Sequence, residues 1–219
     1  MAELADAHDS KSCGGNIMGV RFPLSALMIY IFGLFRVIGV VLYLFMIWSS
    51  MKDDYRSDDV IWLSWISILA FFAGVFFFGL FAGYLLMLAI ITLYVKIKKW
   101  KLPNVLEDGT AAFLVLMFFT YLEEFVRSNW NFYIAIKLFV VMMAYLLVGI
   151  LKKKYRSIVW YKSGKKGFVF WMLSGIVLGI YSIVSLLFKD MAIMSILYGT
   201  VSLLSFIGLF ILGGVWQKK

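Results

Sequence analysis

Long uninterrupted runs of apolar residues dominate this sequence and limit what it can fold into. A helix needs about 20 apolar residues, at a rise of 1.5 Å each, to cross the hydrocarbon core of a bilayer. The chain of 219 residues is 63% hydrophobic and only 15% charged, whereas an ordinary soluble domain has about 25% charged residues. The sequence therefore predicts an all-α integral membrane protein, a polytopic helical bundle.

Six runs are predicted to be transmembrane helices. They cover residues 23–50, 60–94, 110–126, 132–151, 168–188 and 191–215. The second run is too long for one upright helix. Two interpretations of residues 60–94 stay open: one tilted span, or a surface-lying or re-entrant segment followed by a span. We expect residues 1–22 to form a flexible cytoplasmic tail and residues 23–216 to form the transmembrane domain.

The distribution of basic residues predicts the orientation, because Lys and Arg are enriched in cytoplasmic loops. With six spans and a cytoplasmic amino terminus, 15 of the 21 basic residues fall in cytoplasmic segments and four in outer segments. This predicts that both termini are cytoplasmic. It also predicts that Glu123, Glu124, Arg127 and the acidic residues of 53–59 lie at the outer face. Cytoplasmic loops explain the net charge of +9, so we expect no nucleic-acid partner.

The few cysteine and histidine residues exclude several kinds of chemistry. Cys13 and His8 are the only residues of their types, and both lie in the polar first twenty residues. A single cysteine cannot form an internal disulfide or a multi-cysteine metal cluster, and no histidine lies in a predicted span. The sequence also lacks a Gly-rich phosphate loop between a strand and a helix. We therefore expect no metal site and no cofactor.

Arg36 is the residue whose burial in a membrane would be most unfavourable. It lies near the middle of the run 23–50, and an arginine at the centre of a spanning helix costs about 2.5–3.5 kcal/mol. Its planar guanidinium is suited to bidentate contacts with a phosphate or a carboxylate. We interpret Arg36 as a lipid- or anion-binding residue. The alternative is that the run shifts along the membrane normal and Arg36 reaches a membrane surface.

The stretch FFTYLEEFVRSNWNF, residues 118–132, holds the catalytic candidates Glu123, Glu124 and Arg127. Adjacent helical residues point about 100° apart, so we expect one glutamate to face the bundle and the other to face water. The alternative is a surface ion pair between Arg127 and one of the glutamates, which lie three and four residues before it. Lys137, about 9 Å inside the fourth predicted span, is a second lipid- or anion-binding candidate, unless it extends to the outer interface.

Several segments, taken in order, resemble the prolipoprotein diacylglyceryl transferase family of bacterial inner membranes. GLFRVIGVVLYLF, residues 33–45, is similar to the family's Gly-Ala-Arg-Leu-Phe-Tyr stretch and aligns Arg36 with its arginine. Residues 76–109 resemble its glycine-rich span and the basic loop that follows. Residues 118–132 fall at its Arg-x-Gly-Asn-Phe-x-Asn-Gly-Glu signature, and residues 155–190 resemble its penultimate span.

The resemblance implies a lipid-handling protein of the bacterial inner membrane. Family members have seven spans with the amino terminus outside, so the resemblance over residues 24–215 implies that the first span is missing here. They transfer a diacylglyceryl group from phosphatidylglycerol to a cysteine of a lipoprotein precursor. The implied partners are therefore a phosphatidylglycerol-like phospholipid and a lipoprotein precursor. The family's catalytic histidine stretch and second essential arginine have no counterpart here, so we expect lipid binding and leave transferase activity open.

Two other functions stay open at this point. One is a small transporter or channel subunit, with Arg36 as an anion site midway across the membrane. The other is a non-catalytic structural membrane protein. In that protein backbone carbonyls and tyrosines such as Tyr30 or Tyr43 would cap the Arg36 guanidinium.

Overall fold

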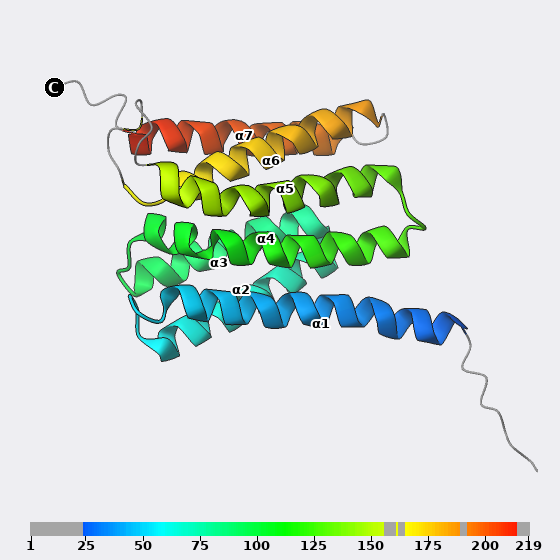
Figure 1. The fold of residues 1–219 in the computed structure, drawn as a ribbon, viewed down its shortest axis with the longest axis horizontal. Coiled ribbons are helices and arrows are strands. Elements are labelled where there is room, and N and C mark those ends of the chain that lie inside the picture. Colours follow the sequence, from blue (N-terminus) through cyan, green and yellow to red (C-terminus); the bar gives the residue numbers. More distant parts are fainter. Residues whose placement is uncertain (1–23, 156–160, 162–164, 189–191, 214–219) are drawn as a thin grey trace, which may run out of the picture.

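The computed structural model of the chain contains seven α-helices connected mostly by short loops (Figure 1). It describes residues 24–155, 161, 165–188 and 192–213. The helices are α1 (Leu24–Met51), α2 (Ser57–Phe78), α3 (Leu80–Ile97), α4 (Leu102–Arg127), α5 (Phe132–Lys154), α6 (Phe168–Leu187) and α7 (Ala192–Gly213). Each of these seven is long and apolar enough to cross a membrane. The all-α, multi-pass membrane architecture is confirmed.

The second predicted run is a hairpin of two helices, which makes the predicted count of six spans wrong. Gly79 separates α2 from α3 with φ 88° and ψ 176°, a conformation that a residue without Cβ adopts readily. The chain turns back at this glycine. The end of α3 lies beside the start of α2, where Lys98 pairs with Asp59 with 2.7 Å between Nζ and Oδ1. No polar residue marks this turn, so the hydrophobic run gave no signal of it.

A second glycine lets the two helices of this hairpin approach closely. A Cβ atom built on Gly83 would lie 2.6 Å from Cγ2 of Val75 and 2.8 Å from the carbonyl oxygen of Phe71. Small residues permit such close backbone contact between membrane helices. The spacing of Gly79 and Gly83 predicts helix packing, and Gly83 serves that purpose whereas Gly79 forms the turn.

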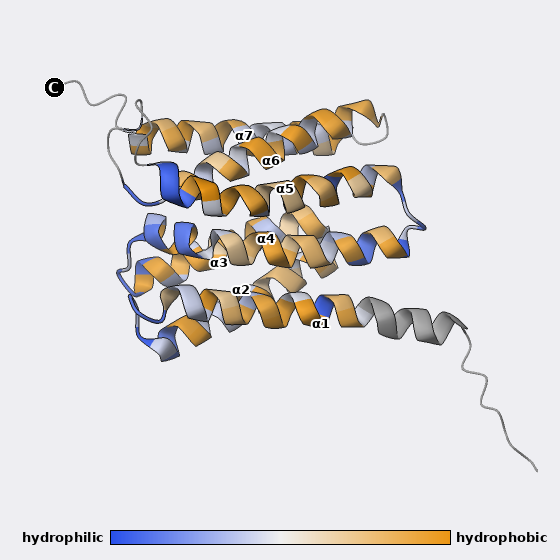
Figure 2. Ribbon diagram, viewed as in Figure 1, coloured by the Kyte–Doolittle hydropathy of each residue, from blue (hydrophilic) through white to orange (hydrophobic). Residues whose placement is uncertain are grey.

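Polar residues gather at one end of the bundle, on the left of Figures 1 and 2, which we call the basic end. Of the fourteen described basic residues, eleven lie there: Lys52, Arg56, Lys96, Lys98, Lys99, Lys101, Lys152, Lys153, Lys154, Lys165 and Lys166. Lys166 lies 3.5 Å from carboxylate oxygens of both Asp54 and Asp108. It therefore links the segment before α6 to α4 and to the loop between α1 and α2. The end of α4 and the start of α5 lie at the opposite end, which we call the far end. Arg127 is the last residue of α4, and Gly79 lines the same cavity as Arg127.

Seven helices also change the predicted orientation. Helix α1 begins at the far end, whereas α7 ends at the basic end (Figure 1). The prediction that both termini lie on one side is therefore wrong, because it required an even number of spans. Asp54 and Asp59 lie at the basic end with their lysine partners, not at the face of Glu123. The positive-inside rule assigns the basic end to the cytoplasm. The predicted tail 1–22 lies outside the described residues.

Helix α4 is the central element of the bundle. Its residues Phe113 and Leu116 belong to a buried cluster shared with α1, α2 and α3. Its residues Leu114 and Tyr121 belong to a second cluster shared with α5, α6 and α7. A helix that is apolar on all sides is typical of a buried position. The candidate residues at the carboxyl end of α4 are therefore held between both halves of the molecule.

Candidate functional site

The candidate site is built on an ion pair between Arg36 of α1 and Glu123 of α4. The two helices are in close contact at Gly39, where an added Cβ would lie 2.7 Å from Cβ of Phe119. One turn away, Arg36 Nε donates to Glu123 Oε2 at 2.7 Å and Nη2 donates to Oε1 at 2.5 Å. This fork-to-fork geometry is the strongest form of an arginine–carboxylate contact. The glycine at position 39 brings the two charged residues within reach.

The two partners differ in exposure. The Arg36 side chain is 40% exposed, whereas that of Glu123 is 8% exposed. The guanidinium also lies 5.9 Å from the ring centre of Phe72 on α2. Arginine has five N–H donors, and Glu123 uses two of them. The remaining three can bind a further anion from the exposed side, while Glu123 fixes the orientation of the guanidinium.

Arg36 lies near the far end of the bundle, which corrects its predicted position at mid-depth. Its partner Glu123 is four residues before Arg127, the last residue of α4, which is about 6 Å at the helical rise. The first turns of α1 extend past the end of α4 (Figure 1). The alternative interpretation, in which Arg36 reaches a membrane surface, is therefore the better one.

A cavity of about 570 Å³ opens beside this ion pair. Its lining residues are Arg36, Phe72, Val75, Phe76, Gly79, Leu80, Thr120, Glu123, Glu124 and Arg127. The turn at Gly79 has space around it, since no atom would lie within 4 Å of a Cβ there. Helices α1, α2 and α4 and the first residue of α3 thus surround a polar cavity, and the hairpin turn forms one side of it.

Glu124 and Arg127 bring one further charge of each sign to the cavity. Glu124 is half-buried and Arg127 is exposed. Among the described residues, neither makes an ion pair. The predicted surface pair between Arg127 and a glutamate is therefore not formed. Of the two adjacent glutamates, Glu123 faces the bundle and Glu124 lines the cavity, as their angular separation predicts.

The arrangement can bind a dipolar or anionic group at the membrane boundary. Arg127 and the free donors of Arg36 suit a phosphate, because guanidinium groups bind oxyanions through several hydrogen bonds. Glu124 can accept hydrogen bonds from a hydroxyl or an ammonium group. Glu124 is also the carboxylate of the cavity that no arginine engages, so it is the one available for proton transfer. Glu123 positions Arg36.

Lys137 does not join this cavity. It is 7% exposed, and its ammonium lies 4.2 Å from the ring centre of Tyr133 and 5.2–5.8 Å from those of Tyr121, Tyr181 and Tyr198. The interpretation that Lys137 extends to the outer interface is wrong, because its side chain points into the bundle. Its predicted role in anion binding remains a prediction.

The structure adds residues that the sequence analysis missed. The four tyrosines around Lys137 come from α4, α5, α6 and α7, so no spacing in the sequence relates them. Tyr84 of α3 belongs to the same region, because it lines a second, apolar cavity together with Tyr121, Tyr181 and Tyr198. Tyrosines in spanning helices are a weak signal, since the residue is also common at membrane interfaces.

Comparison of the chain with protein families, with curated proteins and with solved structures finds no match.

Proposed function

We propose that this membrane protein binds a phospholipid, of the phosphatidylglycerol type, with the headgroup in the cavity beside Arg36. The observation that carries the proposal is the pair of arginines, Arg36 and Arg127, that line one cavity at the far end of the bundle. By the positive-inside rule this is the outer end. A phosphate diester at the level of the outer headgroups is the anion that such a cavity meets in a membrane.

The charges of the cavity fit this ligand. Glu123 is paired with Arg36, so Arg127, which makes no ion pair among the described residues, supplies the positive charge that is open to a phosphate. Glu124 offers carboxylate oxygens as acceptors for the hydroxyl groups of a glycerol headgroup. The apolar side chains of Phe72, Phe76 and Leu80 complete the wall and suit the glycerol backbone and the first acyl carbons.

The resemblance of the sequence to the prolipoprotein diacylglyceryl transferase family supports the same ligand. That family has seven spans, with the amino terminus outside and the carboxyl terminus inside. Seven described helices, the last of which ends at the basic end, match that number of spans. They contradict the missing first span that the alignment of Arg36 with the family's arginine implied. The resemblance extends the proposal to the bacterial inner membrane and to a lipoprotein precursor as a second partner. In a diacylglyceryl transfer, Glu124 would act as the acid or base.

The phospholipid is favoured over the two other functions by the position and pairing of Arg36. A transporter with an anion site at Arg36 needs that residue near mid-depth, but it lies near the end of α4. The structural alternative caps the Arg36 guanidinium with carbonyls and tyrosines such as Tyr30 or Tyr43. Tyr43 bonds Ser67 instead, with 2.8 Å between the hydroxyl oxygens, and the side chain of Tyr30 lies outside the described residues.

Replacement of Arg127 tests the proposal, because this exposed residue makes no ion pair among the described residues and can be changed without loss of a structural contact. In Arg127→Gln we expect binding of phosphatidylglycerol to fall about tenfold, the effect of losing one charged hydrogen bond. Binding of phosphatidylcholine should change less. The measurement is native mass spectrometry of delipidated protein titrated with each lipid.

Lys153→Gln is the matched control, since it removes one positive charge from an exposed residue at the basic end. We expect this variant to bind phosphatidylglycerol like the wild type. Equal loss in both variants would mean that net charge, and not the cavity, attracts the lipid. Unchanged binding in Arg127→Gln would contradict the proposal.

A further inference from the structure

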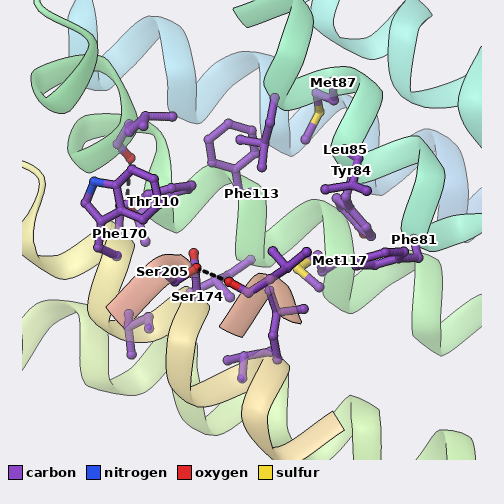
Figure 3. A pocket seen from close by; sticks show the side chains of 18 of the residues that line it. Phe81, Tyr84, Leu85, Met87, Thr110, Phe113, Met117, Phe170, Ser174 and Ser205 are labelled. Carbon is purple, nitrogen blue, oxygen red and sulfur yellow. Dashed lines mark hydrogen bonds between the residues drawn. The ribbon is translucent and has the colours of Figure 1, made fainter. Parts of the chain in front are cut away.

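A long apolar cavity runs through the bundle between α3, α4, α6 and α7 (Figure 3), and we call it the groove. Its volume is about 220 Å³. One face of α4 follows it at helical spacing, through Leu102, Leu106, Thr110, Phe113, Met117 and Tyr121. Tyr121 is 19 positions after Leu102 in the sequence, which corresponds to about 28 Å at the helical rise. A cavity this long with this volume is narrow along its whole length.

The end of the groove that faces the far end of the bundle carries hydroxyl groups. Tyr84 lies there, beside Phe81 and opposite the Thr110 and Phe170 end (Figure 3). The Tyr84 hydroxyl is buried and has no hydrogen-bond partner among the described residues. Buried polar groups are normally paired. Tyr84 thus offers an unused donor to the groove.

Tyr198 offers a second donor across the groove. Phe81, one turn before Tyr84 on α3, packs edge-on against the Tyr198 ring with 4.8 Å between centroids. The Tyr198 hydroxyl accepts a long hydrogen bond from the Lys137 ammonium, with 3.5 Å between the two atoms. A hydroxyl that accepts a hydrogen bond keeps its own hydrogen to donate. The positive charge behind Tyr198 makes that hydroxyl a stronger donor.

Lys137 brings a positive charge to this end of the groove, and its charge interacts with that of Glu124 although the two residues form no ion pair. Its side chain is buried among Tyr121, Tyr133, Tyr181 and Tyr198, and three of these four rings also line the groove. Among the described residues it makes no ion pair. Charged residues inside a membrane protein are rare and are normally paired. The Lys137 ammonium is therefore free to attract an anion bound in the groove.

We infer that the groove binds a single long-chain carboxylate, with its carboxylate at the Tyr84 and Tyr198 hydroxyls and its alkyl chain extended toward Phe170. The narrow groove suits one alkyl chain of about 28 Å or less, and its apolar lining suits hydrocarbon. The two hydroxyls and the Lys137 charge suit a small anionic group. This site is separate from the cavity beside Arg36, none of whose four charged residues lines the groove.

The test compares palmitate with its neutral analogue hexadecan-1-ol, each titrated into delipidated protein and measured by native mass spectrometry. In the wild type we expect palmitate to bind at least tenfold more tightly than hexadecan-1-ol, because only the carboxylate interacts with the Lys137 charge. In Lys137→Met this preference should disappear, while hexadecan-1-ol binds as before. Replacing a buried charge with an apolar residue of similar size is often tolerated, and retained alcohol binding shows that the variant is folded.

Two further variants locate the site. Ser174 lines the groove, so Ser174→Phe should block the alkyl chain and weaken both ligands. Arg127→Gln should leave palmitate binding unchanged even where it weakens phosphatidylglycerol binding, which keeps failure of the two proposals distinguishable. Equal affinity of the wild type for palmitate and hexadecan-1-ol, or palmitate binding unaffected by Ser174→Phe, would overturn the inference.

Discussion

At the scale of single residues, the Arg36–Glu123 pair is asymmetric because one partner is much more exposed than the other. Arg36 is 40% exposed and can be hydrated when its partner is removed, but Glu123 is 8% exposed and cannot. An unpaired buried charge is strongly destabilising, whereas an unpaired exposed charge is not. The two residues should therefore respond differently to replacement.

We predict that Arg36→Met lowers the free energy of unfolding by about 2–4 kcal/mol, because it leaves the Glu123 carboxylate buried without a partner. Glu123→Gln should cost only about 1 kcal/mol, since water solvates part of the guanidinium. The measurement is unfolding of the purified protein in mixed detergent micelles. Equal losses in the two variants would contradict the asymmetry.

The double variant Arg36→Met with Glu123→Gln should be more stable than Arg36→Met alone, because neighbouring residues have coupled effects. Arg56→Met is the control. It breaks an ion pair with Asp58 whose side chains are 78% and 69% exposed, and exposed pairs contribute at most about 1 kcal/mol.

The sequence indicates that Arg36 needs an anion, but it does not indicate which one. Glu123 is 87 residues away, and no local pattern relates positions at that separation. Their contact depends on the register between α1 and α4, which follows from packing at Gly39 and Phe119. The sequence left the depth of Arg36 and the direction of the Lys137 side chain open for a related reason. Depth was counted from the ends of apolar runs, and those ends do not coincide with the ends of neighbouring helices.

At the scale of elements, the hairpin of α2 and α3 depends on close backbone contact at Gly83. No side chain fits at this position, because a Cβ on Gly83 would lie 2.8 Å from the carbonyl oxygen of Phe71. That oxygen belongs to the backbone of α2 and cannot move without it. The hairpin is also the element that the sequence analysis misassigned. Its turn at Gly79 is surrounded by phenylalanine and leucine, so the hydrophobic pattern continues through it without a break.

We predict that Gly83→Ala destabilises the protein by about 1–3 kcal/mol, the usual effect of forcing an extra methyl group into packed structure. Gly149→Ala is the matched control on α5, where no atom lies within 4 Å of an added Cβ. Alanine is more favourable than glycine inside a helix by about 0.5–1 kcal/mol, so this variant should be unchanged or slightly more stable. Thermal denaturation in detergent measures both, and a stable Gly83→Ala variant would contradict the proposed close contact.

At the scale of the whole molecule, seven helices preserve the charge asymmetry that first indicated the orientation. The seven-helix topology assigns the loop 52–56 to the cytoplasmic side, whereas the six-span topology assigned it to the outside. It assigns the segment before α1 to the outside, whereas the six-span topology assigned that segment to the cytoplasm. Each carries two basic residues, so the totals stay equal and the charge count cannot distinguish the two topologies. Composition alone predicted the all-α membrane class. The side of the membrane on which the loop 52–56 lies could be assigned only once the α2–α3 hairpin was known.

Cysteine labelling in intact cells distinguishes the two topologies, in a Cys13→Ala background so that only one thiol is present. We predict that Ser128→Cys reacts with a membrane-impermeant maleimide from outside, because the loop after α4 lies at the far end. Asp53→Cys should react only after the cells are permeabilised, because its loop lies at the basic end. The six-span topology places both positions outside, so outside labelling of Asp53→Cys would contradict the seven-helix arrangement.

The turn at Gly79 has a consequence for how the chain enters a membrane. A loop that passes through the bilayer during biogenesis must bring its charges with it, and moving charge through hydrocarbon is unfavourable. From Ala70 to Thr92 the chain carries no ionisable group except Tyr84. Helices α2 and α3 can therefore insert together from the cytoplasmic side as one unit, with nothing charged to translocate.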